Sequence, residues 1–396
     1  MKPISKTIRL VAGLGLLWAA AGCDKYQGPA AIYDPNAPLG AFPEIRAVEP
    51  ALNAEAGVFR IVIRGRNFAK EAARNSVYFD NTQALIQSCT DTAIVVYRPA
   101  VAGDSLTIKV LVEGAVAFGK YPGYGVAEAA RLYGKLPTKN IVQLLAVDKN
   151  ENLYALKITK DIIRLSTDEY QSPFGMRTFR AKAMDMKAGP DGGMYLQPQK
   201  AKQLYRIPPE GGDTEPYANF AAAAHYFDFD RNGNIFGGGE KTGISVILPD
   251  LTSRVVGDGS DLTVTGLRVY NDGVYVTEGT AIWRLSIMDA DGSLASKTKV
   301  FDITAQAGYE QTQILSFAFS EEGNLFVSIN HADAVLIVYP DGSMEPLYKG
   351  ILPASGGQLV WGNGNYLYLN MTESPKINDI LRIDTGVQGA PNEGLQ

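Results

Sequence analysis

The chain has 396 residues, of which 46% are hydrophobic and 20% are charged, and its formal net charge is −5. Such a chain is long and apolar enough for more than one packed domain, and its acidic balance argues against nucleic acid as a partner. Two cysteines and two histidines exclude a disulfide framework and a histidine-rich zinc centre.

The first 22 residues are predicted to be an export signal. Lys2, Lys6 and Arg9 precede an apolar run over residues 10–20, which is too short for a helix that spans a bilayer of about 30 Å. The ending Ala-Ala-Gly-Cys23 resembles a bacterial lipoprotein signal, although Ala20 stands where leucine is usual. The resemblance implies acylation of Cys23, a lipid anchor and a soluble mature body. The alternative is an ordinary secretory signal.

Residues 23–42 are rich in proline, glycine, alanine and asparagine and show no hydrophobic period. This composition predicts an extended tether, which at about 3.1 Å per residue reaches up to roughly 60 Å. It would hold the folded domains away from the membrane.

Residues 43–118 alternate apolar and polar side chains, with turn residues every ten or so positions. The pattern favours a small antiparallel sandwich, in which Cys89 is a buried, inert thiol. The sequence of the segment, above all Gly65-Arg-Asn-Phe68, resembles that of an IPT/TIG domain, which has an immunoglobulin-like fold. Gly65 would permit a tight backbone turn and Phe68 would plug the sandwich.

Residues 119–127 carry several glycines and a proline and are predicted to form a hinge. Tyr121 and Tyr124 within it, together with Tyr226 further on, are the tyrosines expected to be exposed.

A tract of about forty residues then recurs six times. Each copy has a turn-rich segment followed by a short apolar strand with an aromatic mark, and the marks are spaced 41, 41, 39, 51 and 42 residues apart: Tyr154, Tyr195, Phe236, Tyr275, Phe326 and Tyr368. A period of this size with strands inside it predicts a β-propeller. The turn, aromatic strand and Arg-containing third strand resemble degenerate NHL repeats.

The sixth repeat contains no fourth strand of its own, because only a polar tail, residues 387–396, follows its third strand. Residues 128–137 are similar to residues 344–353, which precede the sixth repeat. We therefore expect residues 128–386 to form six blades, with the segment near residue 130 supplying the outermost strand of the last one. Such closure removes free sheet edges. The tail is predicted to be disordered.

Few patterns point to catalysis. Asp228-Phe-Asp-Arg-Asn-Gly233 looks like the start of a calcium loop, but the twelfth position is Gly239 instead of an acid, and the segment falls where every repeat has a turn. The turn interpretation is favoured, and neither a metal nor a cofactor is expected.

Loops that join second to third strands, and loops that join one blade to the next, open on one face of a propeller. The repeat register places an amide-rich ring of candidate ligand-binding residues there: Lys157, Gln197, Gln199, His225, Tyr226, Glu240, Glu278, Asn330, His331, Asn370 and Glu373. Lys182 and Gln358 belong to the same face. Such a ring suits many hydrogen bonds to a neutral polar ligand, a glycan or a peptide. The alternative is a set of simply solvated loops.

Anchored chains with an IPT/TIG module and an NHL-like propeller resemble surface proteins of Bacteroidota, often found beside SusC/SusD-type nutrient uptake systems. The resemblance implies a non-catalytic, outer-membrane-tethered, surface-exposed binding protein, with a glycan, a peptide or such an uptake complex as partner. Two alternatives remain open. One is a lyase or hydrolase that uses His225, His331, Glu240 or Glu278 at the channel mouth, and the other is an architectural subunit of a membrane complex.

Overall fold

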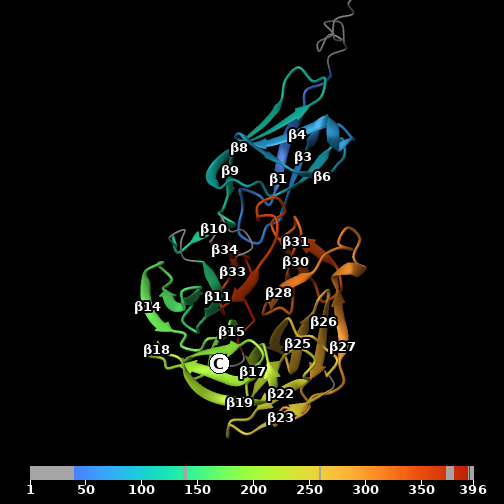
Figure 1. The fold of residues 1–396 in the computed structure, drawn as a ribbon. Coiled ribbons are helices and arrows are strands. Elements are labelled where there is room, and N and C mark those ends of the chain that lie inside the picture. The colour runs from blue at the N-terminus through green and yellow to red at the C-terminus, as the bar shows by residue number, and fades with distance from the viewer. Residues whose placement is uncertain (1–39, 137–140, 258–259, 372–378, 391, 393–396) are drawn as a thin grey trace, which may run out of the picture.

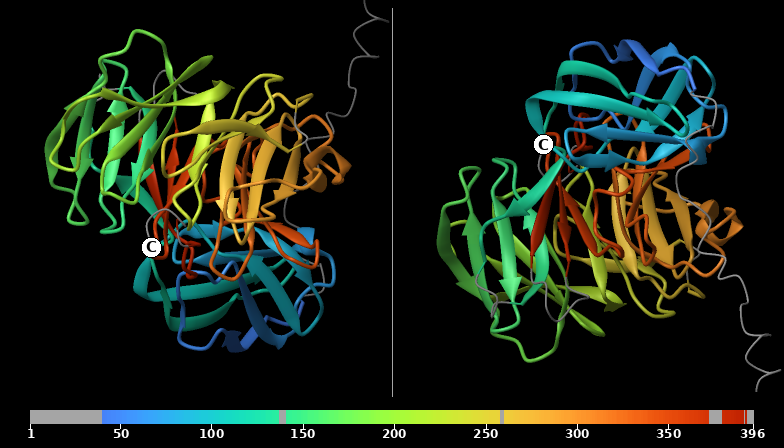
Figure 2. Two further views of the ribbon diagram at one scale, coloured as in Figure 1. Left: turned by 90° about the horizontal axis from the view of Figure 1, so that it is seen from below. Right: turned by 90° about the horizontal axis from the view of Figure 1, so that it is seen from above.

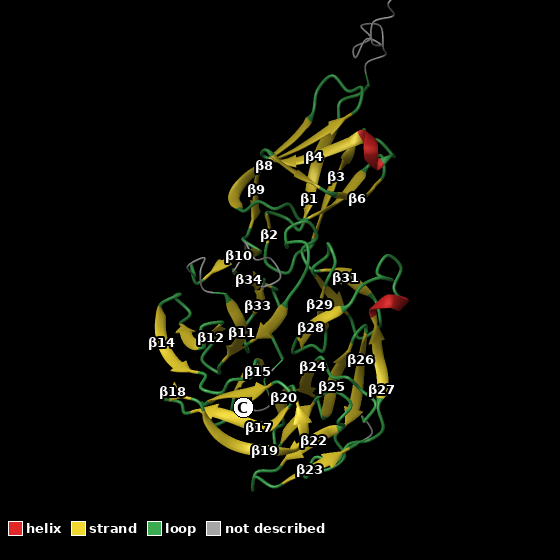
Figure 3. Cartoon of the chain, viewed as in Figure 1, coloured by secondary structure: helices red, strands yellow, loops and turns green. Residues whose placement is uncertain are grey.

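The computed structural model of the protein describes residues 40–136, 141–257, 260–371, 379–390 and 392. A β-sandwich lies beside a larger ring of sheets (Figure 1). In the described residues, the regular elements are strands apart from two single-turn 3-10 helices, η1 (Ala72–Arg74) and η2 (Ile303–Ala305) (Figure 3). Within these ranges, no helix is long and apolar enough to cross a membrane. The predicted signal, Cys23, most of the tether and Glu373 lie outside the described residues.

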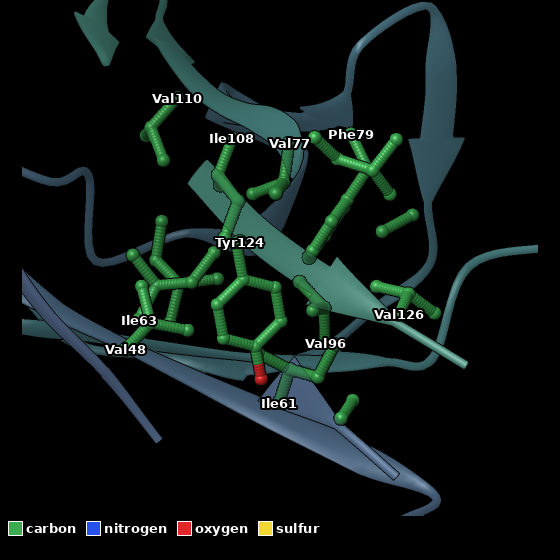
Figure 4. Close-up of a cluster of buried hydrophobic side chains, with 14 of the residues drawn as sticks. Val48, Ile61, Ile63, Val77, Phe79, Val96, Ile108, Val110, Tyr124 and Val126 are labelled. Carbon is green, nitrogen blue, oxygen red and sulfur yellow. The ribbon is translucent and has the colours of Figure 1, made fainter. Parts of the chain in front are cut away.

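The sandwich consists of two sheets. The first has the order β1-β3-β7-β6, formed by β1 (Glu44–Glu49), β3 (Arg60–Arg66), β7 (Ala93–Tyr97) and β6 (Ile86–Cys89). The second has the order β2-β9-β8-β4-β5, formed by β2 (Asn53–Ala54), β9 (Gly119–Val126), β8 (Gly103–Val112), β4 (Asn75–Phe79) and β5 (Thr82–Ala84). Alternate residues of both sheets meet in one core, as period-two patterning requires (Figure 4).

The glycine at position 65 has the predicted role of a close-approach residue. A Cβ there would lie 1.9 Å from the backbone oxygen of Glu44 and 2.5 Å from the Phe68 ring. Phe68 is 5% exposed and belongs to the sandwich core. The residues that carry the IPT/TIG resemblance therefore hold the first sheet together.

The predicted hinge is wrong, because residues 119–126 form β9. This strand pairs antiparallel with β8, with two register shifts, and parallel with β2. Its glycines serve close packing: a Cβ on Gly119 would lie 2.7 Å from the oxygen of Pro43. Tyr124, expected to be exposed, is fully buried, and its hydroxyl donates to the Pro50 carbonyl at 3.0 Å (Figure 4).

The propeller has six blades, as the repeat predicts. Blade one consists of β11 (Val142–Val147), β12 (Leu153–Lys157), β13 (Asp161–Leu165) and β14 (Gln171–Met176). Blade two consists of β15 (Ala183–Ala188), β16 (Met194–Pro198), β17 (Ala201–Ile207) and β19 (Glu215–Ala224). Blade three consists of β20 (Tyr226–Phe229), β21 (Ile235–Gly238), β22 (Ile244–Ile247) and β23 (Ser253–Val256). The short β18 (Gly212–Asp213) pairs with β14 and extends blade one.

Blades four and five are β24 (Gly266–Tyr270), β25 (Gly273–Glu278), β26 (Ala281–Ser286) and β27 (Thr298–Asp302); and β28 (Ile314–Phe319), β29 (Leu325–Ile329), β30 (Val335–Val338) and β31 (Met344–Pro346). Blade six combines β32 (Gln358–Trp361), β33 (Tyr366–Asn370) and β34 (Ile380–Asp384) with β10 (Ala130–Tyr133).

The predicted closure of the ring is confirmed. β10 pairs antiparallel with β34 over four residues, so the outermost strand of blade six comes from the start of the propeller (Figure 1). Tyr133 at the end of β10 is buried, its ring meets that of Tyr368 edge-on at 5.2 Å, and its hydroxyl donates to the Ser166 carbonyl of blade one.

The repeated aromatics and turns are structural. The aromatic marks lie in the second strand of each blade, where five of the six are no more than 5% exposed and Tyr275 is half-buried. In blade three, Asp230 accepts hydrogen bonds from the backbone N–H groups of Asn232 and Asn234, so the calcium-like segment forms the turn that the repeat predicts. Among the residues that the structure describes, no three His, Cys, Asp or Glu side chains gather as a metal would need.

The described part of the C-terminal tail is ordered against the propeller, contrary to the prediction of disorder. Gly389 forms a β-bridge with Ser320, and the Ala390 N–H donates to the Phe319 carbonyl at 2.9 Å. The reason lies in the buried Ala390 side chain, which joins the blade five core.

The sandwich docks against blades five and six (Figures 1 and 2). Tyr348 joins the two domains: its ring contacts Phe59 of the sandwich edge-on at 5.1 Å, and its hydroxyl accepts from the Gly57 N–H at 2.7 Å. Arg60 forms a 2.7 Å ion pair with Glu345 of β31. The two domains therefore share a packed, hydrogen-bonded boundary.

Candidate functional site

A cavity of about 310 Å³ lies on the propeller axis. It is lined by residues of the innermost strands of all six blades: β11, β15, β20, β24, β28 and β32. This volume is at the lower end of the ~300–1,000 Å³ typical of ligand pockets. A pocket here follows from the radial arrangement of the blades, whose inner edges cannot meet on the axis.

Pairing with the second strands shows which residues share a level of the channel. The residues opposite the aromatic marks form one level: Ala146, Lys187, Asp228, Arg268, Ala318 and Val360. The next level towards the loop face is formed by Leu144, Asp185, Tyr226, Gly266, Ser316 and Gln358. Charged side chains at both levels come only from blades two to four, so the channel has one charged side and one uncharged side.

On the charged side, two aspartates brace neighbouring blades. Asp185 accepts from the Phe227 N–H of blade three at 3.1 Å, and Asp228 accepts from the Val269 N–H of blade four at 2.9 Å. Burial raises the pKa of Asp185, although Lys187 and the backbone donors oppose the shift. Each carboxylate therefore links two blades, and Asp185 also lines the cavity.

Two cations accompany these aspartates at longer distances. Lys187 Nζ lies 3.4 Å from Asp185 Oδ2, and Arg268 Nε lies 3.7 Å from Asp228 Oδ2. Their side chains are only 11% and 16% exposed. Both residues line the cavity, so positive charge faces its interior.

On the uncharged side, side chains of blades five and six also link blades. Ser316 Oγ accepts from the Leu359 N–H at 3.0 Å, and the Gln358 amide both accepts from and donates to the backbone of Leu145. Val360 completes this wall, whereas the Trp361 ring packs into the core between blades five and six, 4.7 Å from the Phe326 ring.

Lys182 and Tyr226 define the channel mouth, because each stands where the chain enters the innermost strand of its blade and both line the cavity. Lys182 is exposed. Burial, helped by Asp185, raises the pKa of Tyr226 to about 12, so its hydroxyl remains a neutral donor and acceptor. Of the ten predicted ring residues that the structure describes, Tyr226 is the one that lines this cavity.

Two predicted ring residues, which were expected to be exposed at the rim, are instead buried inside the blades. Gln197 is 0% exposed and donates to the Ala201 and Ala224 carbonyls. Asn370 is 2% exposed and donates to the Val142 carbonyl of blade one at 3.3 Å. Their amides satisfy backbone carbonyls at strand ends, where the ladder stops, which leaves neither side chain accessible to a ligand.

A second group lies outside the cavity, between blades two and three. Glu240 is exposed and forms a 2.7 Å ion pair with Lys200, next to the exposed Gln199. His225 is 8% exposed, and burial lowers its pKa, against the attraction of Glu240. This histidine is therefore neutral near pH 7.

Three of the remaining predicted residues have separate local partners. Glu278 accepts from the Thr263 N–H at 3.1 Å, and Asn330 accepts from the Gln313 N–H at 2.6 Å. His331 Nδ1 accepts from the Asp333 N–H at 3.1 Å, and its ring lies 4.7 Å from that of Tyr309. Lys157 ends β12 and is half-buried. The described ring residues thus make separate local contacts and do not converge on one site.

Sequence reasoning missed Asp185, Lys187 and Arg268. The repeat register did carry a signal for them: blades one, five and six have only uncharged residues at both of these inner-strand positions. A charged residue at a position that is uncharged in other copies of the repeat indicates a role other than core packing.

Comparison with known proteins matches residues 43–124 to the IPT/TIG domain. The match extends beyond residue 118 into β9, in agreement with the structure. A comparison with curated protein sequences finds no match for the chain.

Among solved structures, the chain is similar to an auxiliary nutrient binding protein from Bacteroides ovatus, with a TM-score of 0.52 and 13% identity over 86% of this chain and 97% of that chain. An auxiliary nutrient binding protein from Bacteroides thetaiotaomicron gives 0.51 and 11%, over 89% and 98%. A luciferin-regenerating enzyme gives 0.51 and 12%, over 67% and 99%. At these identities the likeness establishes the fold alone, which is a β-sandwich of the IPT/TIG type followed by a six-bladed β-propeller. The similarity to the two Bacteroides proteins covers more of this chain than the propeller does, so it includes part of the sandwich.

Proposed function

We propose that this chain is a non-catalytic binding protein whose propeller channel captures a small polar ligand at the mouth formed by Lys182 and Tyr226. The observation that carries the proposal is the cavity of about 310 Å³, which combines charged donors on one side with an apolar and amide-bearing wall on the other. Pockets that mix a few placed polar groups with apolar surface are typical of small-molecule sites. The two Bacteroides proteins of similar fold are described as auxiliary nutrient binding proteins, which supports the same role.

A role in binding agrees with the separation of the residues that catalysis would need. His225 faces Glu240 and Lys200, whereas His331 contacts Asp333 and Tyr309. A nucleophile and its base must lie within hydrogen-bond reach of each other. The enzyme alternative draws support from the luciferin-regenerating enzyme, which has a similar propeller, and it predicts turnover of a bound compound.

The proposal also assigns a place in the cell. We propose that Cys23 carries a lipid, that the tether projects the two domains from the outer membrane to the cell surface, and that the protein works as an accessory to a SusC/SusD-type uptake complex. The sequence of the first 42 residues supports this placement. Replacement of Cys23 by serine should move the protein from the membrane fraction to the soluble fraction of expressing cells, and a C23S variant that stays with the membrane contradicts the anchor.

The binding role is tested by titrating purified mature protein with neutral and charged mono- and oligosaccharides and short peptides in a calorimeter. We expect at least one class to bind, and Tyr226→Ala to weaken that binding. The matched control is Tyr170→Ala, because Tyr170 is 70% exposed and lies on blade one away from the channel. Binding that is lost equally in both variants, or conversion of the ligand to a product, contradicts the proposal.

A further inference from the structure

We propose that the channel selects ligands that carry a carboxylate, which Arg268 and Lys187 hold inside the cavity and Lys182 attracts at the mouth. This inference rests on the proposed binding function and names the ligand class for that site.

The first step concerns the free hydrogen-bonding capacity of the two buried cations. An ammonium offers three donors and a guanidinium five. Lys187 and Arg268 approach their aspartates at 3.4 Å and 3.7 Å, longer than the roughly 2.7–2.9 Å of a charge-assisted hydrogen bond. Within the described part of the chain, neither cation makes a shorter polar contact. Lys and Arg are seldom this buried without full partners, so these donors are available to a ligand.

The second step is that the aspartates are already satisfied. Asp185 accepts from the N–H groups of Met186 and Phe227, at 2.9 and 3.1 Å. Asp228 accepts from the N–H groups of Phe229 and Val269, at 3.1 and 2.9 Å. Two backbone donors stabilise each carboxylate in place between two blades. The cations can therefore turn towards a ligand without leaving a carboxylate unsolvated.

The third step is the sign of the charge inside the cavity. The chain as a whole has a net charge of −5, yet the cavity lining contains three cations, Lys182, Lys187 and Arg268, against the acid Asp185. Counting Asp228, which lies behind Arg268 outside the lining, still leaves one positive charge in excess. Low-dielectric walls concentrate such a field and raise the local concentration of anions. The lining thus reverses the charge of the protein around it.

The fourth step is the shape of the guest. A volume of about 310 Å³ equals roughly ten water molecules at about 30 Å³ each. The planar fork of Arg268 matches the two oxygens of a carboxylate, and the opposite wall offers Val360 and the Gln358 amide to the rest of the ligand. A compact molecule with an acid at one end and a hydroxylated or short apolar body fits, such as a uronic acid or the C-terminus of a short peptide.

The test uses calorimetric titration of the mature protein with two pairs of probes, each an acid and its neutral counterpart: galacturonic acid with galactose, and trialanine with trialanine amide. We expect one acid to bind at least about 10-fold more tightly than its neutral counterpart, and Arg268→Gln to weaken that acid about 10- to 100-fold, the range for a hydrogen bond to a charged group. The pair that discriminates tells a sugar acid from a peptide.

Two further variants control for folding and for charge. Lys182→Gln changes an exposed side chain at the mouth, so it reports on the site even if Arg268→Gln unfolds. Lys157→Gln removes the same charge at the end of a second strand outside the cavity lining and should leave binding unchanged. Neutral counterparts that bind as tightly as the acids, acids that bind R268Q and K182Q as they bind the wild type, or no binding by either acid would each overturn the inference. Tyr226-dependent binding of galactose or the amide leaves the proposed function standing.

Discussion

Loss of the Tyr348 hydroxyl should uncouple the sandwich from the propeller. This hydroxyl accepts from the Gly57 N–H of the sandwich at 2.7 Å and donates to the Asp384 carbonyl of β34 at 2.5 Å. Tyr348→Phe keeps the ring, and with it the contacts to Phe59 and to the Arg98 guanidinium, 5.6 Å from the ring centroid. The variant therefore isolates two hydrogen bonds at the domain boundary.

The size of the effect follows from burial. Tyr348 is 1% exposed, so water does not simply replace its hydroxyl. A net hydrogen bond contributes about 0.5–1.5 kcal/mol, and a buried group left without a partner costs about 1–3 kcal/mol. Two backbone groups lose their partner here, so we expect Tyr348→Phe to lower the free energy of unfolding by about 2–3 kcal/mol.

The assay can report on the two domains separately. Trp283 and Trp361 both lie in the propeller, and no tryptophan lies in the sandwich. Tryptophan fluorescence thus follows propeller unfolding in urea, whereas far-ultraviolet circular dichroism follows both domains. Coincident transitions in the wild type that separate in Y348F, with no change in a Tyr170→Phe control, are the expected result. Unchanged midpoints by both probes would refute the coupling, because independent domains unfold independently.

Three other changes test the ring, the channel face and the sandwich. Tyr133→Ala should lower the free energy of unfolding of the propeller by about 3–5 kcal/mol, as expected for a buried aromatic, whereas Leu132→Ala, next to it on β10 but 57% exposed, should change it little. Thermal unfolding measures both, and equal effects would argue against stabilisation of the ring by the Tyr133 contacts. The folded pKa of His225 is lowered below 6.5 by burial, so the unfolded chain takes up a proton first and the stability due to this residue is lost as pH falls through the window below 6.5. The urea midpoint of the wild type should therefore fall relative to His225→Asn between about pH 8 and about pH 5, and a rise would contradict the burial argument. Gly65→Ala should destabilise the sandwich by at least about 1–3 kcal/mol, because its Cβ would lie 1.9 Å from the Glu44 oxygen; an unchanged melting temperature by circular dichroism would show that β1 can shift freely.

The repeat explains why the architecture of the propeller could be predicted from the sequence. Each aromatic mark had to follow its turn and pack against the next blade, and one contact of this kind, Tyr195 against Phe229 at 5.1 Å, shows the reason. Closure by residues near 130 followed from the missing strand of blade six, since a ring with an open edge would be unstable. These features are periodic, and periodicity is visible in one sequence.

The hinge prediction failed for a physical reason. Glycines in β9 resemble a flexible linker by composition, but they allow the backbone of Pro43 and the side chain of Asn53 to approach Gly119 and Gly125 closely. Composition counts glycines without telling whether their freedom or their small size is used. Only the pairing of β9 with β8 and β2 decides between the two.

The candidate ring was predicted among the loops, whereas the cavity lies in the layer of the inner strands. Loop residues such as Glu240 and Asn330 were chosen because polar loops carry function. In the structure, however, Glu240 forms an ion pair with Lys200, and Asn330 accepts a hydrogen bond from the Gln313 backbone. The channel charges sit on inner strands, where a sequence reader expects packing. An inner strand has one edge without a neighbouring strand, so a charge there can face the axis instead of a core. Arg268 stands in a series whose other members are alanine, valine or the charged residues Lys187 and Asp228, and this becomes visible only when the six inner strands are compared. A ligand site in such a ring is therefore found by comparing the blades with one another, at the level of the channel, and not by searching the loops for reactive residues.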